Sequence, residues 1–191
     1  MQISTTISDG ALVLACSVAA CLAFAPHPSG AAGFALVGLA AFAGVLRFSV
    51  MPQIAPLHVF LSAFAAQVGV PLVGFALVQK AASVGQAALA PIVVGVALTL
   101  LFLLFHLWIK LPAYALGVGA LGMLAATAAG ARLVAGGDWT AGMQAILGAL
   151  AVAFAGLAIG DQGQLGAFRR IDLFHYVLAT AMLLMGSALR T

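Results

Sequence analysis

The chain of 191 residues is poor in charge: seven basic and four acidic side chains make up 6% of it, and glutamate and asparagine are both missing. Soluble domains carry roughly 25% charged residues, so these are too few to cover a water-facing surface. The apolar residues, 65% of the chain, form long runs and not the short alternating segments of a β-barrel. Helices in a lipid bilayer are expected, because a helix satisfies its own backbone hydrogen bonds.

Several signals of function are also missing. The net charge of +3 is spread over short loops, and there is no basic stripe, no glycine-rich phosphate loop and no CxxC pair. Nucleic acid is therefore not an expected partner. The two cysteines, Cys16 and Cys21, lie in one expected helix on poorly matched faces, and we interpret them as packing residues and not as a disulfide.

Seven apolar runs are each about the 20 residues that a bilayer crossing needs, and short clusters of proline, glycine and charge separate them. The expected spans are Ser8–Ala25, Gly30–Phe48, Leu57–Gln79, Ala87–Ile109, Pro112–Ala135, Thr140–Ile159 and Ile171–Leu189. Short connections favour antiparallel neighbours, so the sequence predicts an all-α polytopic membrane protein, one transmembrane domain over residues 1–191. Asp9 is interpreted as the N-cap of the first span. That span lacks a basic start and a small-residue cleavage site, so it is expected to be a retained helix.

Small residues suggest how these helices pack. Eight glycines suit close helix approach: Gly33, Gly38, Gly44, Gly117, Gly122, Gly142, Gly148 and Gly156. Pro71 and Pro91 lie inside expected spans, where each should remove a backbone hydrogen bond and bend its helix. Gln67 and Gln144 could bond between helices, and Arg132 could reach the membrane surface or pair with Asp138.

Alternating helix direction assigns every loop to one of two membrane faces, called side A for the face of the N-terminus and side B for the other. Side B holds His27, Lys80, Arg132, Asp138 and Arg190. Side A collects Asp9, Arg47, His58, His106, Lys110, Asp161, Arg169, Arg170, Asp172 and His175. Four basic residues on side A against three on side B place the N-terminus toward the cytoplasm.

Ionisable groups on side A are candidates for chemistry, because such groups are costly at membrane depth and usually functional. His58 opens the third span, His106 lies near the end of the fourth, and Asp172 and His175 are one turn apart on the seventh. Imidazoles and a carboxylate can hold a catalytic zinc; two histidines can hold a haem, and the same groups can carry protons. Structural roles are open too: His58 and His106 in the headgroup layer, Asp172 at a helix N-terminus, Arg47 as a headgroup anchor.

The small and polar helix faces that contain these groups are expected to turn inward, which leaves leucine, valine and phenylalanine for lipid. At least three of the four side chains of His58, His106, Asp172 and His175 are therefore expected to line one cavity on side A.

Seven short helices, polar residues near one face and the start of the last helix, Asp172-Leu-Phe-His175, resemble the CREST superfamily, which includes alkaline ceramidases and the progestin and adipoQ receptors. The resemblance implies a seven-helix membrane protein and, in many members, a zinc-dependent hydrolase of lipid amide bonds. Helix two of those proteins usually carries a serine and a histidine four residues apart, where this chain has Ala43 and Arg47. The usual aspartate of helix three and the second histidine of helix seven are missing. His58 and His106 would then be replacement ligands.

Two classes of function follow. The leading hypothesis is a metal-dependent lipid amide or ester hydrolase of the bacterial inner membrane. His58, His106 and His175 would bind zinc, Asp172 would be a ligand or orient one, and Arg47 would neutralise a headgroup or an oxyanion. The alternative is a non-enzymatic protein that binds haem, a lipid or a partner membrane protein. A transporter is disfavoured, because there is no internal repeat and little charge mid-membrane. Membrane lipids are the expected partners, and the sequence indicates no oligomeric state.

Overall fold

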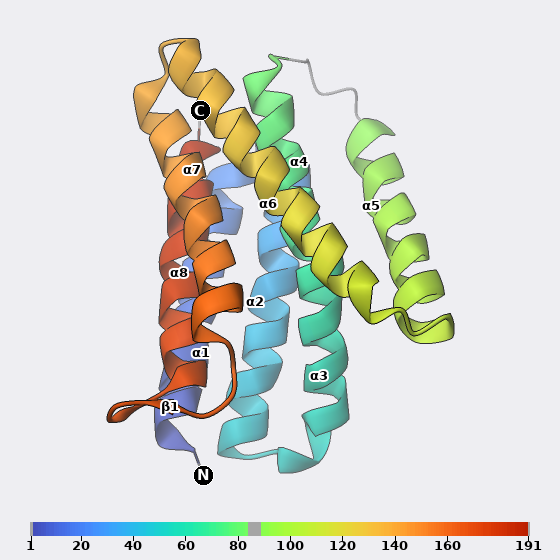
Figure 1. Cartoon of the computed structure of the whole chain (residues 1–191), viewed down its shortest axis with the longest axis vertical. Coiled ribbons are helices and arrows are strands. Elements are labelled where there is room, and N and C mark those ends of the chain that lie inside the picture. The colour runs from blue at the N-terminus through green and yellow to red at the C-terminus, as the bar shows by residue number, and fades with distance from the viewer. Residues whose placement is uncertain (1, 84–88, 191) are drawn as a thin grey trace.

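The computed structural model describes residues 2–83 and 89–190, which form a bundle of long helices (Figure 1). Four of the long helices are single elements: α1 (Ile3–Ala23), α2 (Pro28–Ser49), α6 (Pro112–Ala135) and α8 (Arg170–Ala188). The other three are continuous helices built from several elements. The first consists of η1 (Pro52–Ile54), α3 (Ala55–Phe64), η2 (Ala65–Gly69) and α4 (Val70–Ala81), the second of α5 (Leu89–Phe102) and η3 (Leu103–Trp108), and the third of α7 (Trp139–Phe154) and η4 (Ala155–Ile159). In the described part of the chain, seven helices are long and apolar enough to cross a membrane. The predicted all-α class and helix count are confirmed.

Helix boundaries follow local signals in the sequence. Pro28 and Pro112 each lie in the first turn of their helix, where a backbone N–H would have no partner inside the helix and its loss costs nothing. Asp138 caps α7 by accepting a hydrogen bond from the backbone N–H of Ala141 at 3.2 Å. The first helix begins at Ile3 and not at Ser8. The expected start of the fourth span, Ala87, lies outside the described residues.

The first and last helices of the chain pack against each other. α1 and α8 run side by side in the same direction, and Gly186 of α8 lies so close to α1 that an added Cβ would be 2.5 Å from the Cβ of Ala19. The free ends of these two helices lie at opposite ends of the molecule (Figure 1). An odd number of long helices, with the two termini at opposite ends of the molecule, agrees with the expected alternation of helix direction.

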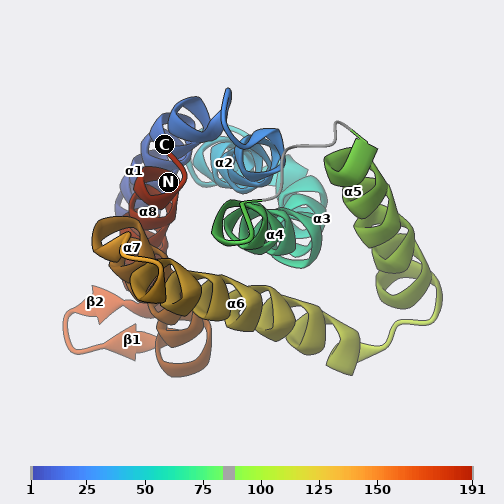
Figure 2. The ribbon, with the colours of Figure 1, turned by 90° about the horizontal axis from the view of Figure 1, so that it is seen from above.

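α6 crosses the bundle obliquely, and two glycine contacts fix its path (Figure 2). Gly122 contacts Gly74 of α4, and Gly130 packs against Gly142 of α7. Toward side A, α6 and α7 diverge. A Cβ added at Gly117 or at Gly156 would meet nothing within 4 Å, so the prediction that these two glycines pack helices is wrong. They lie where the helices separate.

Pro71 and Pro91 were each expected to remove a backbone hydrogen bond from a helix. Pro71 is the second residue after the π-helical turn η2, and it has no N–H to pair with the carbonyl of Gln67 four residues earlier, which interrupts the regular α-helical bonding there. Pro91 lies near the start of the described part of α5, and Ala87, four residues before it, lies outside the described residues, so the effect of Pro91 stays a prediction.

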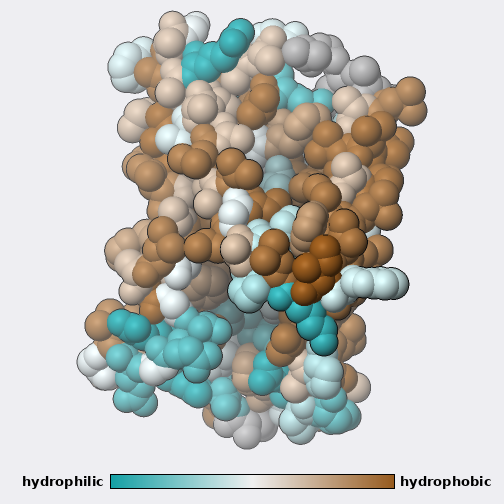
Figure 3. Space-filling view, turned by 45° about the vertical axis from the view of Figure 1, so that its right-hand side comes forward, coloured by the Kyte–Doolittle hydropathy of each residue, from teal (hydrophilic) through white to brown (hydrophobic). Residues whose placement is uncertain are grey.

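α5 lies at the edge of the bundle, apart from the ring formed by the other helices (Figure 2). Phe102 is its one buried residue between Leu89 and Phe102. Apolar residues cover the middle of the face that contains α5, and hydrophilic residues gather at its two ends (Figure 3). This distribution is compatible with an integral membrane protein.

A small β-hairpin on side A joins η4 to α8, and the sequence did not predict it. β1 (Gln164–Leu165) pairs antiparallel with β2 (Phe168–Arg169). Gly166 opens the two-residue turn with φ of +60°, a conformation that favours glycine. The hairpin positions Arg169 directly before α8.

Candidate functional site

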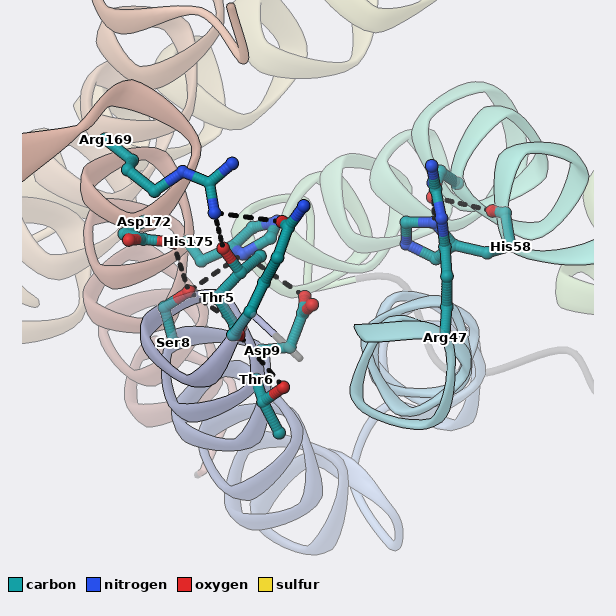
Figure 4. Close-up of polar contacts among 11 residues, drawn as sticks. Thr5, Thr6, Ser8, Asp9, Arg47, His58, Arg169, Asp172 and His175 are labelled. Atoms are coloured by element: carbon teal, nitrogen blue, oxygen red, sulfur yellow. Dashed lines mark hydrogen bonds and ion pairs between the residues drawn. The ribbon is translucent and has the colours of Figure 1, made fainter. Parts of the chain in front are cut away.

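A buried polar cluster joins α1 to α8 on side A (Figure 4). Ser8, Asp9, Asp172 and His175 are each at most 7% exposed. The Nδ1 atom of His175 lies 3.2 Å from Ser8 Oγ and 3.2 Å from Asp9 Oδ1. Ser8 Oγ also contacts Asp172 Oδ1 at 3.4 Å. The cluster therefore surrounds one imidazole with two carboxylates and a hydroxyl.

Asp9 is the member of this cluster that lacks a hydrogen bond. Its Oδ1 is within ion-pair distance of His175, but the angles do not make a hydrogen bond, and neither carboxyl oxygen has a partner among the described residues. The expected N-cap role is wrong, because α1 begins at Ile3 and Asp9 lies inside it, 1% exposed. Gly44 of α2 makes room for the carboxylate: a Cβ there would lie 2.5 Å from Asp9 Oδ2.

A second pair, Arg47 of α2 and His58 of α3, faces this cluster (Figure 4). The Arg47 guanidinium donates to His58 Nδ1 at 2.9 Å. Its charged carbon lies 4.8 Å from the centre of the Phe48 ring, whose edge meets the His58 ring. Arg47 is thus fixed between two rings and is more than a flexible headgroup anchor.

Arg169 makes the polar contacts at the outer edge of the cluster on side A. It donates to Gln2 Oε1 at 2.9 Å and to Thr5 Oγ1 at 3.3 Å. The start of α8 is therefore tied to the start of α1, and this tie holds Asp9 and His175 in register.

A cavity of about 580 Å³, partly open to the outside of the bundle, reaches this polar end. Asp9, His58 and His175 belong to its lining, with Ser62 and Thr127 as the hydroxyls. The rest is apolar and small and comes from α1, α2, α3, η2, α4, α6, α7, η4 and α8, including Leu12, Val37, Ala40, Ala65, Gly119, Met123, Val152, Gly156 and Leu178. The cavity is thus a mainly apolar chamber with ionisable groups at one end.

The two histidines of the cavity have different hydrogen-bonding partners. A guanidinium can only donate, so His58 Nδ1 accepts and its proton is on Nε2. The Nδ1 atom of His175 faces Ser8 Oγ and Asp9 Oδ1 instead, and the direction of these contacts depends on the tautomer of the ring. In the tautomer with the proton on Nδ1, Nε2 is unprotonated and can act as a base.

His106 and Asp172 do not share this chamber. His106, in η3, accepts from the side-chain amide of Gln67 at 2.9 Å and stacks on Phe102 with ring centres 4.8 Å apart. Asp172 is buried beside Ser8. In the described part of the chain, the cavity lining includes two of the four expected side chains, so the prediction of at least three is wrong. The cause is the outlying position of α5 and η3, which carries His106 away from the centre. Gln67 does bond between helices, as predicted.

The donor set does not fit the predicted three-histidine zinc site. Among the residues that the structure describes, no three histidine, cysteine or acidic side chains are grouped to hold a metal. His58 faces the guanidinium of Arg47, which disfavours a second cation there, and His106 bonds to Gln67 outside the cavity. Haem binding stays a prediction, which an absorption spectrum of the purified protein tests.

Sequence reasoning missed Asp9, Ser8, Thr5 and Gly44 as site residues. One signal was present: Thr5, Ser8 and Asp9 are spaced i, i+3 and i+4, which places three polar groups on one helix face in an apolar run. An earlier helix start would have placed Asp9 inside the membrane, where an acidic residue indicates function. Gly44 carries no such signal, because its importance depends on a neighbouring helix.

Comparisons of this chain with protein-family models, with curated proteins and with solved structures give no match. The CREST resemblance stays a prediction. What this chain can do is inferred from the geometry of its cavity.

Proposed function

We propose that this protein resides in the bacterial inner membrane, binds a lipid in the cavity and hydrolyses an amide or ester bond of that lipid. One observation carries the proposal: a mainly apolar cavity of about 580 Å³ ends at two histidines with different partners, Arg47 beside His58, and Ser8 with Asp9 beside His175. Its volume lies in the range of roughly 300–1,000 Å³ typical of small-molecule sites. The hydrocarbon chain would lie against the apolar lining and the polar carbonyl near His58 and His175.

The two histidines fit the two needs of carbonyl hydrolysis. His175 Nε2 takes a proton from water, and the hydroxide oxygen forms a bond to the carbonyl carbon. The carbonyl oxygen becomes an oxyanion, which the Nε2–H of His58 and the charge of Arg47 stabilise. The bond to the amide nitrogen or ester oxygen then breaks, and the leaving atom takes the proton from His175. Products are a fatty acid and an amine or an alcohol.

Asp9 and Arg47 act on this reaction through the histidines they contact. The carboxylate keeps the proton of His175 on Nδ1 and stabilises the imidazolium that forms when Nε2 takes a proton. The guanidinium of Arg47 keeps His58 Nδ1 as an acceptor, and therefore Nε2 as a donor. Opposite environments thus give two identical side chains different roles.

Incubation of the purified protein in lipid nanodiscs with medium-chain N-acyl amines and esters, followed by mass spectrometry of the released fatty acid, tests this proposal. Wild type should release fatty acid, and His175→Gln should be slower by roughly 10²–10⁴-fold, the typical contribution of a general base. His106→Gln is the matched control, because His106 lies outside the cavity. A wild-type rate equal to that of empty nanodiscs overturns the hydrolase. A parallel sample treated with a chelator tests zinc: an unchanged rate is expected.

The second candidate is a lipid-binding protein without turnover. One observation favours it: the Ser62 hydroxyl of the cavity donates to the carbonyl of His58 at 2.8 Å, inside its own helix, and so is not prepared as a nucleophile. Lipid that co-purifies with wild type but is never cleaved would select this candidate.

A further inference from the structure

The hydroxyl of Ser8 makes a hydrogen bond with the Nδ1 atom of His175, at 3.2 Å and with suitable angles (Figure 4). Asp9 Oδ1 lies at the same distance from Nδ1, but the angles there do not make a hydrogen bond. Ser8 belongs to α1 and His175 to α8, and the two residues are 0% and 7% exposed. The hydrogen bond at Nδ1 is thus made by Ser8, while Asp9 acts there by its charge.

We infer that Ser8 is a positioning residue for the reaction: its hydroxyl accepts a hydrogen bond from Nδ1 of His175, holds the proton on that nitrogen and leaves Nε2 unprotonated. The inference rests on the proposed function, in which Nε2 of His175 acts as the base. It names the group that selects the tautomer which the base needs, since the hydrogen bond at one ring nitrogen determines the state of the other.

The direction of this hydrogen bond follows from the other partners of Ser8. A hydroxyl has one proton to give and can accept two hydrogen bonds. Two acceptors lie in contact with it: the backbone carbonyl of Thr5 at 3.0 Å and Asp172 Oδ1 at 3.4 Å. If Ser8 gave its proton to His175, the buried carboxylate of Asp172 would lose a donor. The unprotonated Nδ1 would also face Asp9 Oδ1 at 3.2 Å, acceptor against acceptor. A proton on Nδ1 avoids both costs.

Ser8 acts through His175 and not as a nucleophile. In the described part of the chain, the cavity lining includes His175 but not Ser8, which is fully buried between α1 and α8. A carbonyl group in the cavity therefore does not meet its hydroxyl. Asp172 lies outside the lining too and contacts the hydroxyl of Ser8, so this carboxylate acts on the imidazole through Ser8.

Nitrogen NMR of the full-length protein in lipid nanodiscs, with nitrogen-15 in the histidine rings, tests the inference. Protonated and unprotonated ring nitrogens resonate apart, and the signals lost in His175→Gln belong to His175. Wild type should show the proton of His175 on Nδ1. Ser8→Ala should move much of the population to the tautomer with the proton on Nε2. Fatty-acid release by this variant should be about tenfold slower, as the loss of one hydrogen bond predicts.

Three further variants separate the hydroxyl from the packing of α1. Ser8→Thr keeps the hydroxyl and should keep the wild-type tautomer. Asp172→Asn replaces an acceptor with a group that can donate to Ser8, so the hydroxyl proton can turn to His175 and the tautomer should shift as in Ser8→Ala. Ser17→Ala is the matched control: Ser17 also lies in α1, but its hydroxyl donates to the carbonyl of Val13 at 2.9 Å, so tautomer and rate should not change.

A proton on Nε2 of His175 in wild type, alone or together with one on Nδ1, overturns the inference. A wild-type tautomer in Ser8→Ala overturns it as well, because the charge of Asp9 would then be sufficient. The wild-type spectrum needs no variant, so the test stands even if Ser8→Ala folds poorly. If the spectra are as expected but wild type releases no fatty acid, the proposed reaction is overturned and the control of the tautomer by Ser8 stands.

Discussion

Charged residues lie at both ends of this bundle, but they make different kinds of contact at the two ends. On side B, Lys80 of α4 donates to the carbonyl of Ala188 at 2.7 Å and lies 3.8 Å from Asp138. Arg132 donates to the carbonyl of Ala81 at 2.9 Å. These contacts satisfy carbonyls at helix ends and join α4 to α8 and α6, so the charges of side B stabilise the fold. Of the two roles predicted for Arg132, the pairing with Asp138 is wrong, because Asp138 pairs with Lys80, whereas the exposed position of Arg132 at side B agrees with the other.

On side A, the charged residues face a chamber. Asp9 and His175 are as buried as any core residue, yet Asp9 lacks a hydrogen bond among the described residues. The difference teaches that charge alone does not identify a site in a membrane bundle. A cluster of buried ionisable groups beside a cavity indicates a ligand site, whereas a charged group bonded to a helix end stabilises the fold.

The sharpest comparison makes the same substitution at both ends. Arg47→Met removes the donor that fixes His58 and should slow hydrolysis by roughly 10²–10³-fold, as for loss of an oxyanion-stabilising group. Arg132→Met on side B should leave the rate within about twofold, since it only satisfies a carbonyl. Fatty-acid release per folded protein is the measurement. Equal losses in both variants would mean that Arg47 is structural.

Adding a methyl group at a glycine between α1 and α2 tests how tightly side A is packed. Gly44→Ala would place Cβ 2.5 Å from Asp9 Oδ2, so α1 or α2 must shift, at a cost of about 1–3 kcal/mol of unfolding free energy. Gly10→Ala is the control, because a Cβ there meets nothing within 4 Å, and it should be neutral or more stable by up to about 1 kcal/mol. Unfolding in detergent measures both. Equal stability of the two variants would contradict the close contact.

Side B should respond to loss of its lysine in stability but not in rate. Lys80→Met removes the hydrogen bond to Ala188 and the contact with Asp138, and should cost about 1 kcal/mol of unfolding free energy. The same detergent unfolding series measures it. A change in fatty-acid release without a change in stability would connect side B to the reaction.

The smallest expected effect is a pH dependence on side B. Burial, and then the charge of Lys80, lower the pKa of His27, which lies in the loop between α1 and α2. The unfolded chain therefore binds the proton more readily, with a pKa of about 6.5. The contribution of His27 to stability is complete above pH about 6.5 and is lost as pH falls through the folded value. His27→Gln should flatten this part of the stability curve, and an unchanged curve would contradict it.

Much of the fold follows from local properties of the sequence. The positions of the spans are correct to within a few residues, because run length and breaker clusters are read along the chain. Pro112 and Ala135 bound α6 as expected. The start of α1 was placed too late, because Asp9 resembles a cap when its neighbours in space are unknown. That one boundary concealed the acidic residue of the site.

The site itself was predictable only in part. His58 and His175 were identified as cavity residues from helix direction, and they do share the chamber. His106 has the same residue type, depth and side, but it belongs to the outlying α5–η3 helix and bonds to Gln67. Direction fixes the end of a helix at which a residue lies. It does not fix which helix lies in the ring or which way the residue faces.

The sequence by itself determined the helical class, the helix count and the end of the bundle where ionisable groups gather, because these depend on composition and on order along the chain. The tertiary structure decided which groups meet. Gly44, Gly122 and Gly130 set how close particular helices come, and these contacts join residues far apart in sequence. They leave a cavity between α6 and α7 and bring Asp9 beside His175, since helix rotation and neighbour order arise from packing between helices and not from any one of them.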